Sequence, residues 1–292
     1  MTDFSHLVFA VLVTGGLVLA TGTAFGDTGF HPFFAFKNSL EKRVPEIEEQ
    51  AALLADVGFD GFDHRELVAL DEALRALDKH DLNLFTIYFR VDIDAEENAF
   101  NAGLSEALPL LKDRGTVLWC NTHSKEYGPS DPAGDRRAVP IFQRLADMVA
   151  PFGVRVAPYP HVNMWVESPE DTARLAGKVD RPNFGTSFNL YHWNALKGER
   201  KRPLAEVAKL LAPKLMVLSI NGDEGKRIDI GPLEEEDIGD YVEVLRTFRA
   251  EGYRGPVGLQ CYAIEEAPGV HLRQSMSVWR AIKTKLTKAG DR

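Results

Sequence analysis

The sequence predicts a single (β/α)8 TIM barrel, an α/β fold in which eight parallel strands alternate with eight helices. Two observations in the 292-residue chain favour this fold: short apolar runs alternate with helix-period segments as far as the end, and no break in composition divides them. The runner-up, a doubly wound open sheet, often carries a GxGxxG or GxxxxGK[ST] loop, and neither motif occurs. Barrels of this kind usually occupy about 250 residues as one domain.

The expected strands are short and nearly continuous in apolar residues, as strands buried on both faces should be. In chain order they are Pro32–Phe36, Gly61–His64, Asn83–Phe89, Thr116–Asn121, Val154–Tyr159, Asn183–Phe188, Leu215–Ile220 and Val257–Cys261. Helices are expected near residues 44–57, 66–79, 95–111, 136–151, 169–179, 203–211, 235–251 and 271–287. Ser168 and Pro169 form a helix-start signal, and Gly58 and Gly252 stand where a left-handed residue ends a helix.

Residues 1–26 stand apart and are predicted to be a signal peptide or an N-terminal anchor, which leaves residues 27–292 for the barrel. The stretch LVFAVLVTGGLVLA is uncharged and shorter than the ~20 residues that span a membrane. Its flank MTDFSH lacks the Lys or Arg of a typical signal peptide. We expect an exported protein, periplasmic or extracellular, that is bound to a membrane only if this segment is uncleaved.

Charge and cysteine content limit the partners. The net charge of −9 argues against nucleic acid as a ligand. Cys120 and Cys261 fall on strands that the fold places on opposite sides of the barrel, farther apart than the ~4–7 Å between Cα atoms that a disulfide needs. We therefore expect two buried free thiols.

Polar and aromatic residues close each expected strand, at the end where barrels of this class build their active sites. They are Lys37 and Asn38; Asp63, His64 and Arg65; Tyr88 and Arg90; Asn121 and His123; Tyr159 and His161; Asn189 and His192; Asn221 and Asp223; and Gln260 and Tyr262. A purely structural barrel does not need so many hydrogen-bonding groups at one rim. Their convergence predicts a small polar ligand such as a carbohydrate.

Four phrases near strand ends carry a family resemblance: VRVAPYPH, PNFGTSFNLYHW, VLSINGDEG and GPVGLQCY. Over roughly residues 30–285 the chain resembles the sugar phosphate isomerase/epimerase family of xylose-isomerase-like barrels. The resemblance implies a divalent metal held by Glu, Asp, His and Glu, one from each of the last four strands. In this sequence those positions hold Tyr159, Asn189, Ser219 or Asn221, and Gln260. The histidines that usually follow the first two ligands remain, as His161 and His192.

These substitutions put the implied metal in doubt. Asn189 and Gln260 keep the shape of a carboxylate side chain but lose its charge and gain N–H donors. Divalent ions such as Mn²⁺ and Mg²⁺ need anionic oxygens, so we expect weak binding at the usual position. The sequence does not decide whether a metal is bound, because another set of side chains offers ligands for a displaced metal. That set comprises His123, His161, His192, Asp63, Asp223 and Glu66.

The hypothesis that follows is an enzyme of the sugar isomerase or epimerase type. It would abstract a proton next to the carbonyl of a neutral sugar or keto-sugar, leading to isomerisation, epimerisation or β-elimination. His161 and His192 would exchange the proton. Substrate contacts would come from Tyr159, Asn189, Trp193, Asn221, Gln260, His64, Lys37 and His123. The alternative is a non-catalytic carbohydrate-binding barrel that has lost its metal site. Substrate identity and oligomeric state are left open.

Overall fold

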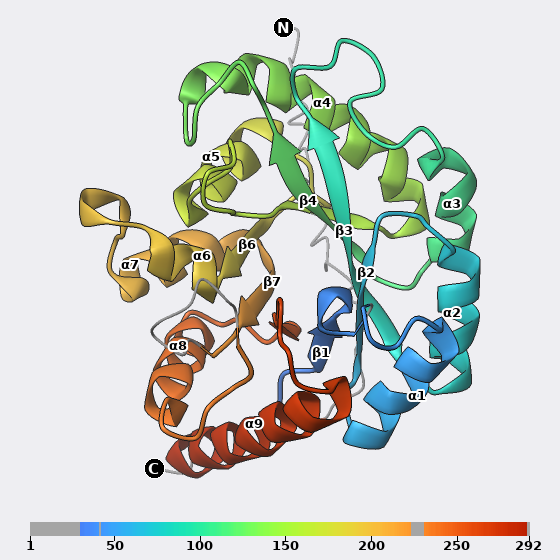
Figure 1. Cartoon of the computed structure of the whole chain (residues 1–292). Helices are drawn as coiled ribbons and strands as arrows, with labels where there is room; N and C mark the ends of the chain where they lie inside the picture. The colour runs from blue at the N-terminus through green and yellow to red at the C-terminus, as the bar shows by residue number, and fades with distance from the viewer. Residues whose placement is uncertain (1–29, 41, 223–230, 291–292) are drawn as a thin grey trace, which may run out of the picture.

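The structure, a computed structural model, describes residues 30–40, 42–222 and 231–290, which form a nearly closed parallel barrel (Figure 1). The strands are β1 (Phe33–Phe36), β2 (Gly61–Arg65), β3 (Asn83–Asp92), β4 (Val117–His123), β5 (Arg155–Pro158), β6 (Thr186–Asn189), β7 (Leu215–Ile220) and β8 (Val257–Leu259). Their order is β5-β4-β3-β2-β1-β8-β7-β6. A parallel bridge between Val156 and Phe184 joins the two ends, so the predicted (β/α)8 fold is confirmed.

The helices pack around the outside of the strands, as Figure 1 shows. They are α1 (Ile47–Val57), α2 (Leu70–Lys79), α3 (Leu104–Leu111), α4 (Asp135–Val149), α5 (Pro169–Val179), α6 (Leu190–Ala195), α7 (Leu204–Leu211), α8 (Ile238–Ala250) and α9 (Pro268–Gly290). The Ser168 side chain accepts a hydrogen bond from the Asp171 N–H in a capping box at the start of α5. Gly58 and Gly252 have φ values of 97° and 91°. The helix-start and helix-end signals are therefore confirmed.

The largest difference from expectation lies between β3 and β4. The helix predicted over residues 95–111 begins only at Leu104. The preceding residues fold back instead, because the Asp92 N–H donates to the Ala99 carbonyl at 2.7 Å and Val91 bridges Phe100 in an antiparallel pair. Strands β3 and β4 also run beyond their predicted ends, to Asp92 and to His123.

Two apolar clusters fill the space on either side of the strands. The larger one lies between strands and helices, and the smaller one fills the barrel with side chains that include Phe34, Trp119 and Met216. Inside the barrel the Trp119 indole N–H donates to the Ser187 hydroxyl at 2.7 Å. The packed base of the barrel supports a site at its mouth.

Cys120 and Cys261 are both buried free thiols, as predicted. No helix in the described part of the chain is long and apolar enough to cross a membrane. The predicted signal peptide or anchor at residues 1–26 lies outside the described residues, so export stays a prediction.

Candidate active site

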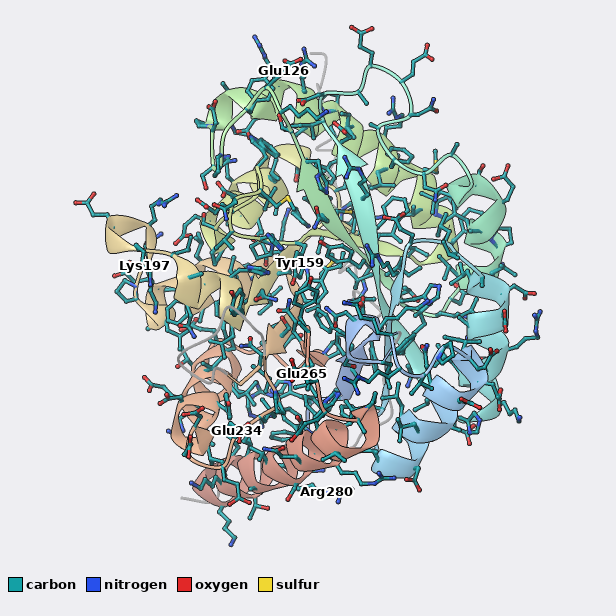
Figure 2. The ribbon with its side chains drawn as sticks, viewed as in Figure 1. Glu126, Tyr159, Lys197, Glu234, Glu265 and Arg280 are labelled. Atoms are coloured by element: carbon teal, nitrogen blue, oxygen red, sulfur yellow. The ribbon has the colours of Figure 1, made fainter. Side chains whose placement is uncertain are left out.

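A cavity of about 480 Å³ opens at the carboxyl ends of the strands. Tyr159 lies near the middle of the ring of strands beneath it (Figure 2). The lining residues lie in or directly after β1, β2, β3, β5, β6 and β8: they are Phe36, Lys37, Asn38, Asp63, Arg65, Tyr88, Tyr159, His161, Val162, Asn163, Tyr191, His192, Gln260 and Tyr262. Many of these come from the polar strand ends that the sequence singles out.

A hydrogen-bonded network of four side chains lies at the floor of this cavity. The Asn189 amide nitrogen is 2.9 Å from the Tyr159 hydroxyl, 2.8 Å from the Ser219 hydroxyl and 2.6 Å from Gln260 Oε1. Asn189 and Ser219 are fully buried, and Tyr159 and Gln260 nearly so. These four side chains satisfy one another, and they are among the positions that the sequence resemblance implies for a metal.

The orientation of the Asn189 amide follows from the neighbouring helix. Asn189 is the N-cap of α6, and its Oδ1 accepts the His192 backbone N–H at 2.9 Å. Because Oδ1 is committed to this cap, the NH2 group must point into the network.

The network does not fit a divalent metal. The Asn189 NH2 group donates protons where a metal would need lone pairs. Burial raises the pKa of the Tyr159 phenol well above its usual range, an effect that the nearby Tyr88 and Asp63 reinforce. None of the four side chains is therefore anionic at neutral pH. In the described residues no three His, Cys, Asp or Glu side chains form another metal-ligand group, and Asp223 of the displaced set lies outside them.

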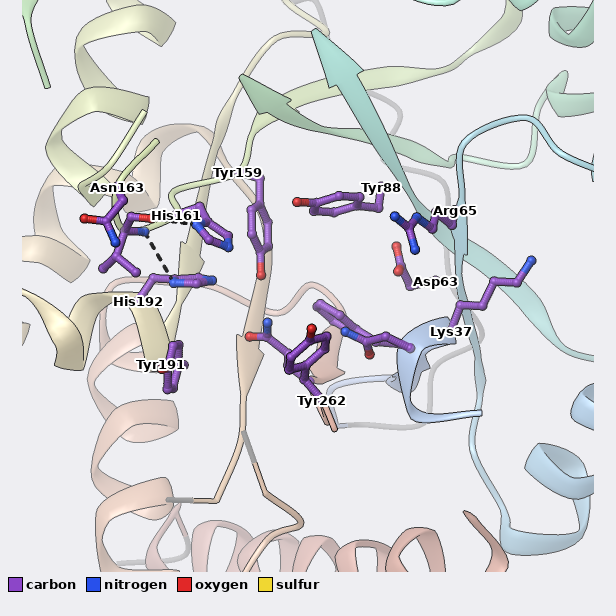
Figure 3. Close-up of a pocket in the computed structure, with 14 residues that line it drawn as sticks. Lys37, Asp63, Arg65, Tyr88, Tyr159, His161, Asn163, Tyr191, His192 and Tyr262 are labelled. Carbon is purple, nitrogen blue, oxygen red and sulfur yellow. Dashed lines mark hydrogen bonds between the residues drawn. The ribbon is translucent and has the colours of Figure 1, made fainter. Parts of the chain in front are cut away.

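His161 and His192 lie against each other on one wall of the cavity, with ring centroids 3.9 Å apart (Figure 3). His161 Nδ1 is 2.8 Å from the Val162 carbonyl oxygen and must carry a proton to donate to it, which leaves the lone pair on Nε2. His192 Nδ1 accepts the Val162 N–H at 3.4 Å, which places its proton on Nε2. The pair therefore combines one acceptor with one donor.

Both imidazoles are neutral at physiological pH. Burial lowers the pKa of His161, and burial, followed by repulsion from a protonated His161, lowers the pKa of His192 to about 2. His192 Nε2 is buried without a partner among the described residues. A neutral imidazole N–H without a partner is a suitable donor to a carbonyl oxygen.

The facing wall carries charged groups. Asp63 and Arg65 lie in β2, Lys37 follows β1, and Figure 3 places all three on the side of the cavity away from the histidines. The Asp63 carboxylate accepts the Thr86 hydroxyl at 2.6 Å, which fixes its position. Tyr88 bridges the two walls, with its ring 5.3 Å from that of Tyr159. The cavity therefore has an imidazole pair on one side and a carboxylate on the other.

Several of the buried polar atoms without partners lie at this end of the barrel. In the described residues they include Asn38 Oδ1, His64 Nδ1, Asn121 Oδ1, His192 Nε2 and Asn221 Oδ1. Such atoms are costly to bury unless a ligand or water completes their hydrogen bonds. Asn38 and His192 line the central cavity, and Asn121 lines a neighbouring one.

Some predicted substrate contacts lie elsewhere. His64 is buried beneath the loop after β2, where its Nε2 donates to the Val68 carbonyl at 2.8 Å. Burial, followed by the nearby Lys37, lowers its pKa to about 4. Trp193 does not line the central cavity: its ring contacts Phe188 and Lys201, and its N–H donates to a backbone carbonyl.

Asn221 and Asn189 are buried and do not line the central cavity, whereas Lys37, Tyr159, His161, His192 and Gln260 do. His123 lines the neighbouring cavity. Sequence reasoning missed Val162, Asn163 and Tyr191 as lining residues. They belong to the loop after β5 and to α6, where no strand pattern indicates which side chains face inward.

Fold and site together define a (β/α)8 barrel with a polar cavity at the carboxyl ends of its strands, the place where such barrels bind small molecules. The chain belongs to the xylose isomerase-like TIM barrel family, whose model matches residues 51–282. The family resemblance seen in the sequence is thus confirmed.

Individual relatives are distant. The chain is 22% identical over 205 residues to a ketose 3-epimerase of Arthrobacter globiformis, and the match spans 65% of each protein. Its fold is similar to that of an L-ribulose 3-epimerase, with a TM-score of 0.70, 13% identity and coverage of 90% of this chain and 97% of that one. It is also similar to a D-allulose 3-epimerase of a Methylomonas species, with a TM-score of 0.69, 15% identity and coverage of 87% and 98%.

Proposed function

We propose that this protein is a sugar epimerase or isomerase that moves a proton next to the carbonyl of a neutral keto-sugar without a metal at the usual family position. The observation that carries the proposal is the His161–His192 pair, an acceptor and an unpartnered donor side by side in a polar cavity. The likeness to a ketose 3-epimerase supports the substrate class.

In the proposed reaction, His161 Nε2 takes the proton from the carbon beside the carbonyl, and the electron pair left behind forms an enediolate. The His192 Nε2–H donates to the oxygen on which negative charge develops. Tyr159 and Gln260 reach the cavity floor and bind hydroxyl groups of the sugar. A solvent proton that reaches the opposite face through the Asp63 carboxyl group on the facing wall converts the enediolate into the epimer, and His161 then releases the proton it took to solvent. The reaction is redox-neutral and needs no co-reactant.

Deuterium exchange tests this proposal. The protein is incubated in D2O with EDTA and with D-fructose, D-allulose, D-tagatose or L-ribulose, and proton NMR follows loss of the signal next to the carbonyl. We expect exchange into at least one ketose that persists in EDTA. His161→Gln should slow it about 100-fold or more, the usual contribution of a general base.

His80→Gln is a matched control, because His80 pairs with Glu48 on the outer surface at the end of α2. Its exchange rate should equal that of the unaltered protein. Ketose binding without exchange would contradict the enzyme and favour the carbohydrate-binding barrel instead. Exchange that stops in EDTA and returns with Mn²⁺ would contradict the metal-free mechanism.

A further inference from the structure

A second cavity of about 750 Å³ adjoins the central one. Arg65 and Tyr88 line both cavities, so the two lie side by side. The second cavity lies over the ends of β3 and β4, beyond the mouth of the barrel proper. A single sugar ring in the central cavity would leave this space unused.

The extra length of β3 and β4 builds one wall of the second cavity. In the ladder between these strands Tyr88 is paired with Trp119, Arg90 with Asn121, and Asp92 with His123. Alternate residues share one face of a strand, so the last two pairs continue the inward face that Tyr88 and Trp119 present to the barrel. From Tyr88 to Asp92 this face extends about 13 Å at the usual rise of a strand.

The opposing wall is the segment over residues 95–103, which folds back on β3 instead of forming a helix. Glu66 links this segment to β3: its carboxylate accepts the Arg90 backbone N–H at 2.7 Å and hydrogen bonds to the Asn101 side chain. Glu66 adopts a left-handed φ of 53°, a conformation that is unfavourable for a residue other than glycine. The second cavity is therefore built by specific contacts.

The lining of the second cavity suits a neutral, hydroxyl-rich group. Only 2% of the Asn121 surface is exposed, and its Oδ1 has no partner among the described residues. The cations Arg65 and Arg90 are matched by the anions Glu66 and Asp92, so the walls carry no net charge that would select an anion.

We infer that the second cavity is a subsite for another sugar ring, so that the substrate is a keto-disaccharide or a related glycoside with its reacting ring in the central cavity. This inference rests on the proposed function for the chemistry of the central cavity. Tyr88 and Arg65 lie at the junction, where the link between the two rings passes. Arg90, Asn121 and His123 contact the outer ring.

Binding of matched sugars tests the subsite. Isothermal titration compares D-fructose with three keto-disaccharides that contain it, lactulose, isomaltulose and turanose. We expect at least one disaccharide to bind tenfold or more tightly than fructose. Arg90→Ala and His123→Ala should each remove most of that advantage and leave fructose binding within twofold. Arg75→Ala is the matched control, since Arg75 is an exposed arginine paired with Asp71 on α2.

The outcomes separate the subsite from the reaction. Equal binding of fructose and all disaccharides, or a disaccharide advantage that survives both substitutions, would overturn the subsite, and deuterium exchange into a ketose would still support the reaction. A disaccharide advantage that Arg90→Ala removes, without exchange in any sugar, would support the subsite and overturn the proposed reaction. Failure of every sugar to bind would overturn both.

Discussion

Asn189→Asp is the sharpest perturbation of the network at the cavity floor. The substitution keeps Oδ1, which caps α6, and replaces the NH2 group with an oxygen. That oxygen would lie about where the nitrogen is now, 2.6 Å from Gln260 Oε1, so two acceptors would face each other. The hydroxyls of Tyr159 and Ser219 can rotate to donate, but the contact with Gln260 is lost unless its amide turns over.

The expected cost is about 2–3 kcal/mol in the free energy of unfolding at pH 7. It combines a lost buried hydrogen bond, an acceptor left without a donor, and a buried negative charge. Burial raises the pKa of such a carboxyl above its value in the unfolded chain, so the penalty is absent at low pH and grows as the pH rises. Asn189→Ala should cost about 1 kcal/mol more than the loss of the contacts alone, because it also removes the cap.

Urea unfolding followed by circular dichroism measures these differences. The gap between the Asn189→Asp variant and the unaltered protein should narrow between pH 7 and pH 5. The double substitution Asn189→Asp with Gln260→Glu restores two anionic oxygens and should make the melting temperature rise with Mn²⁺. An Asn189→Asp variant as stable as the unaltered protein at pH 7, or an unaltered protein that Mn²⁺ stabilises equally, would refute the account of the network.

Three further predictions concern pH, ligand contact and packing. Burial lowers the pKa of His64 to about 4 and that of His192 to about 2, so the unfolded chain takes up their protons first as the pH falls. Protonation of each histidine in the unfolded chain should reduce the free energy of unfolding by about 2 kcal/mol from pH 7 to pH 5. In urea titrations, the His64→Gln variant should show a smaller decline over this pH range. Tyr159→Phe should destabilise the fold by about 1 kcal/mol and weaken ketose binding in calorimetry, and unchanged affinity would argue against a role in the site. Gly61→Ala should cost about 3 kcal/mol, because its Cβ would come within 2.2 Å of a carbonyl oxygen of β3, whereas Gly177→Ala meets no atom within 4 Å and should be neutral or stabilising in the same unfolding assay.

The fold could be predicted from the sequence because its signals are local. Strand and helix periodicities depend on residues within one or two turns of each other, and the Ser168 capping box and the left-handed Gly58 involve only neighbouring residues. The polar strand ends were also readable, since parallel strands bring their carboxyl ends to one rim.

The identity of the side chains that face the cavity required the tertiary structure. Asp63 and His64 are adjacent and both polar, yet strand pleating turns Asp63 toward the cavity and His64 beneath a loop. The segment over residues 95–103 has a helix-like pattern, but pairing with β3 outweighs that weak local preference. The Asn189 network joins Asn189 to Gln260, 71 residues further along the sequence. No local pattern encodes such contacts, because they form only when the barrel brings its last four strands together.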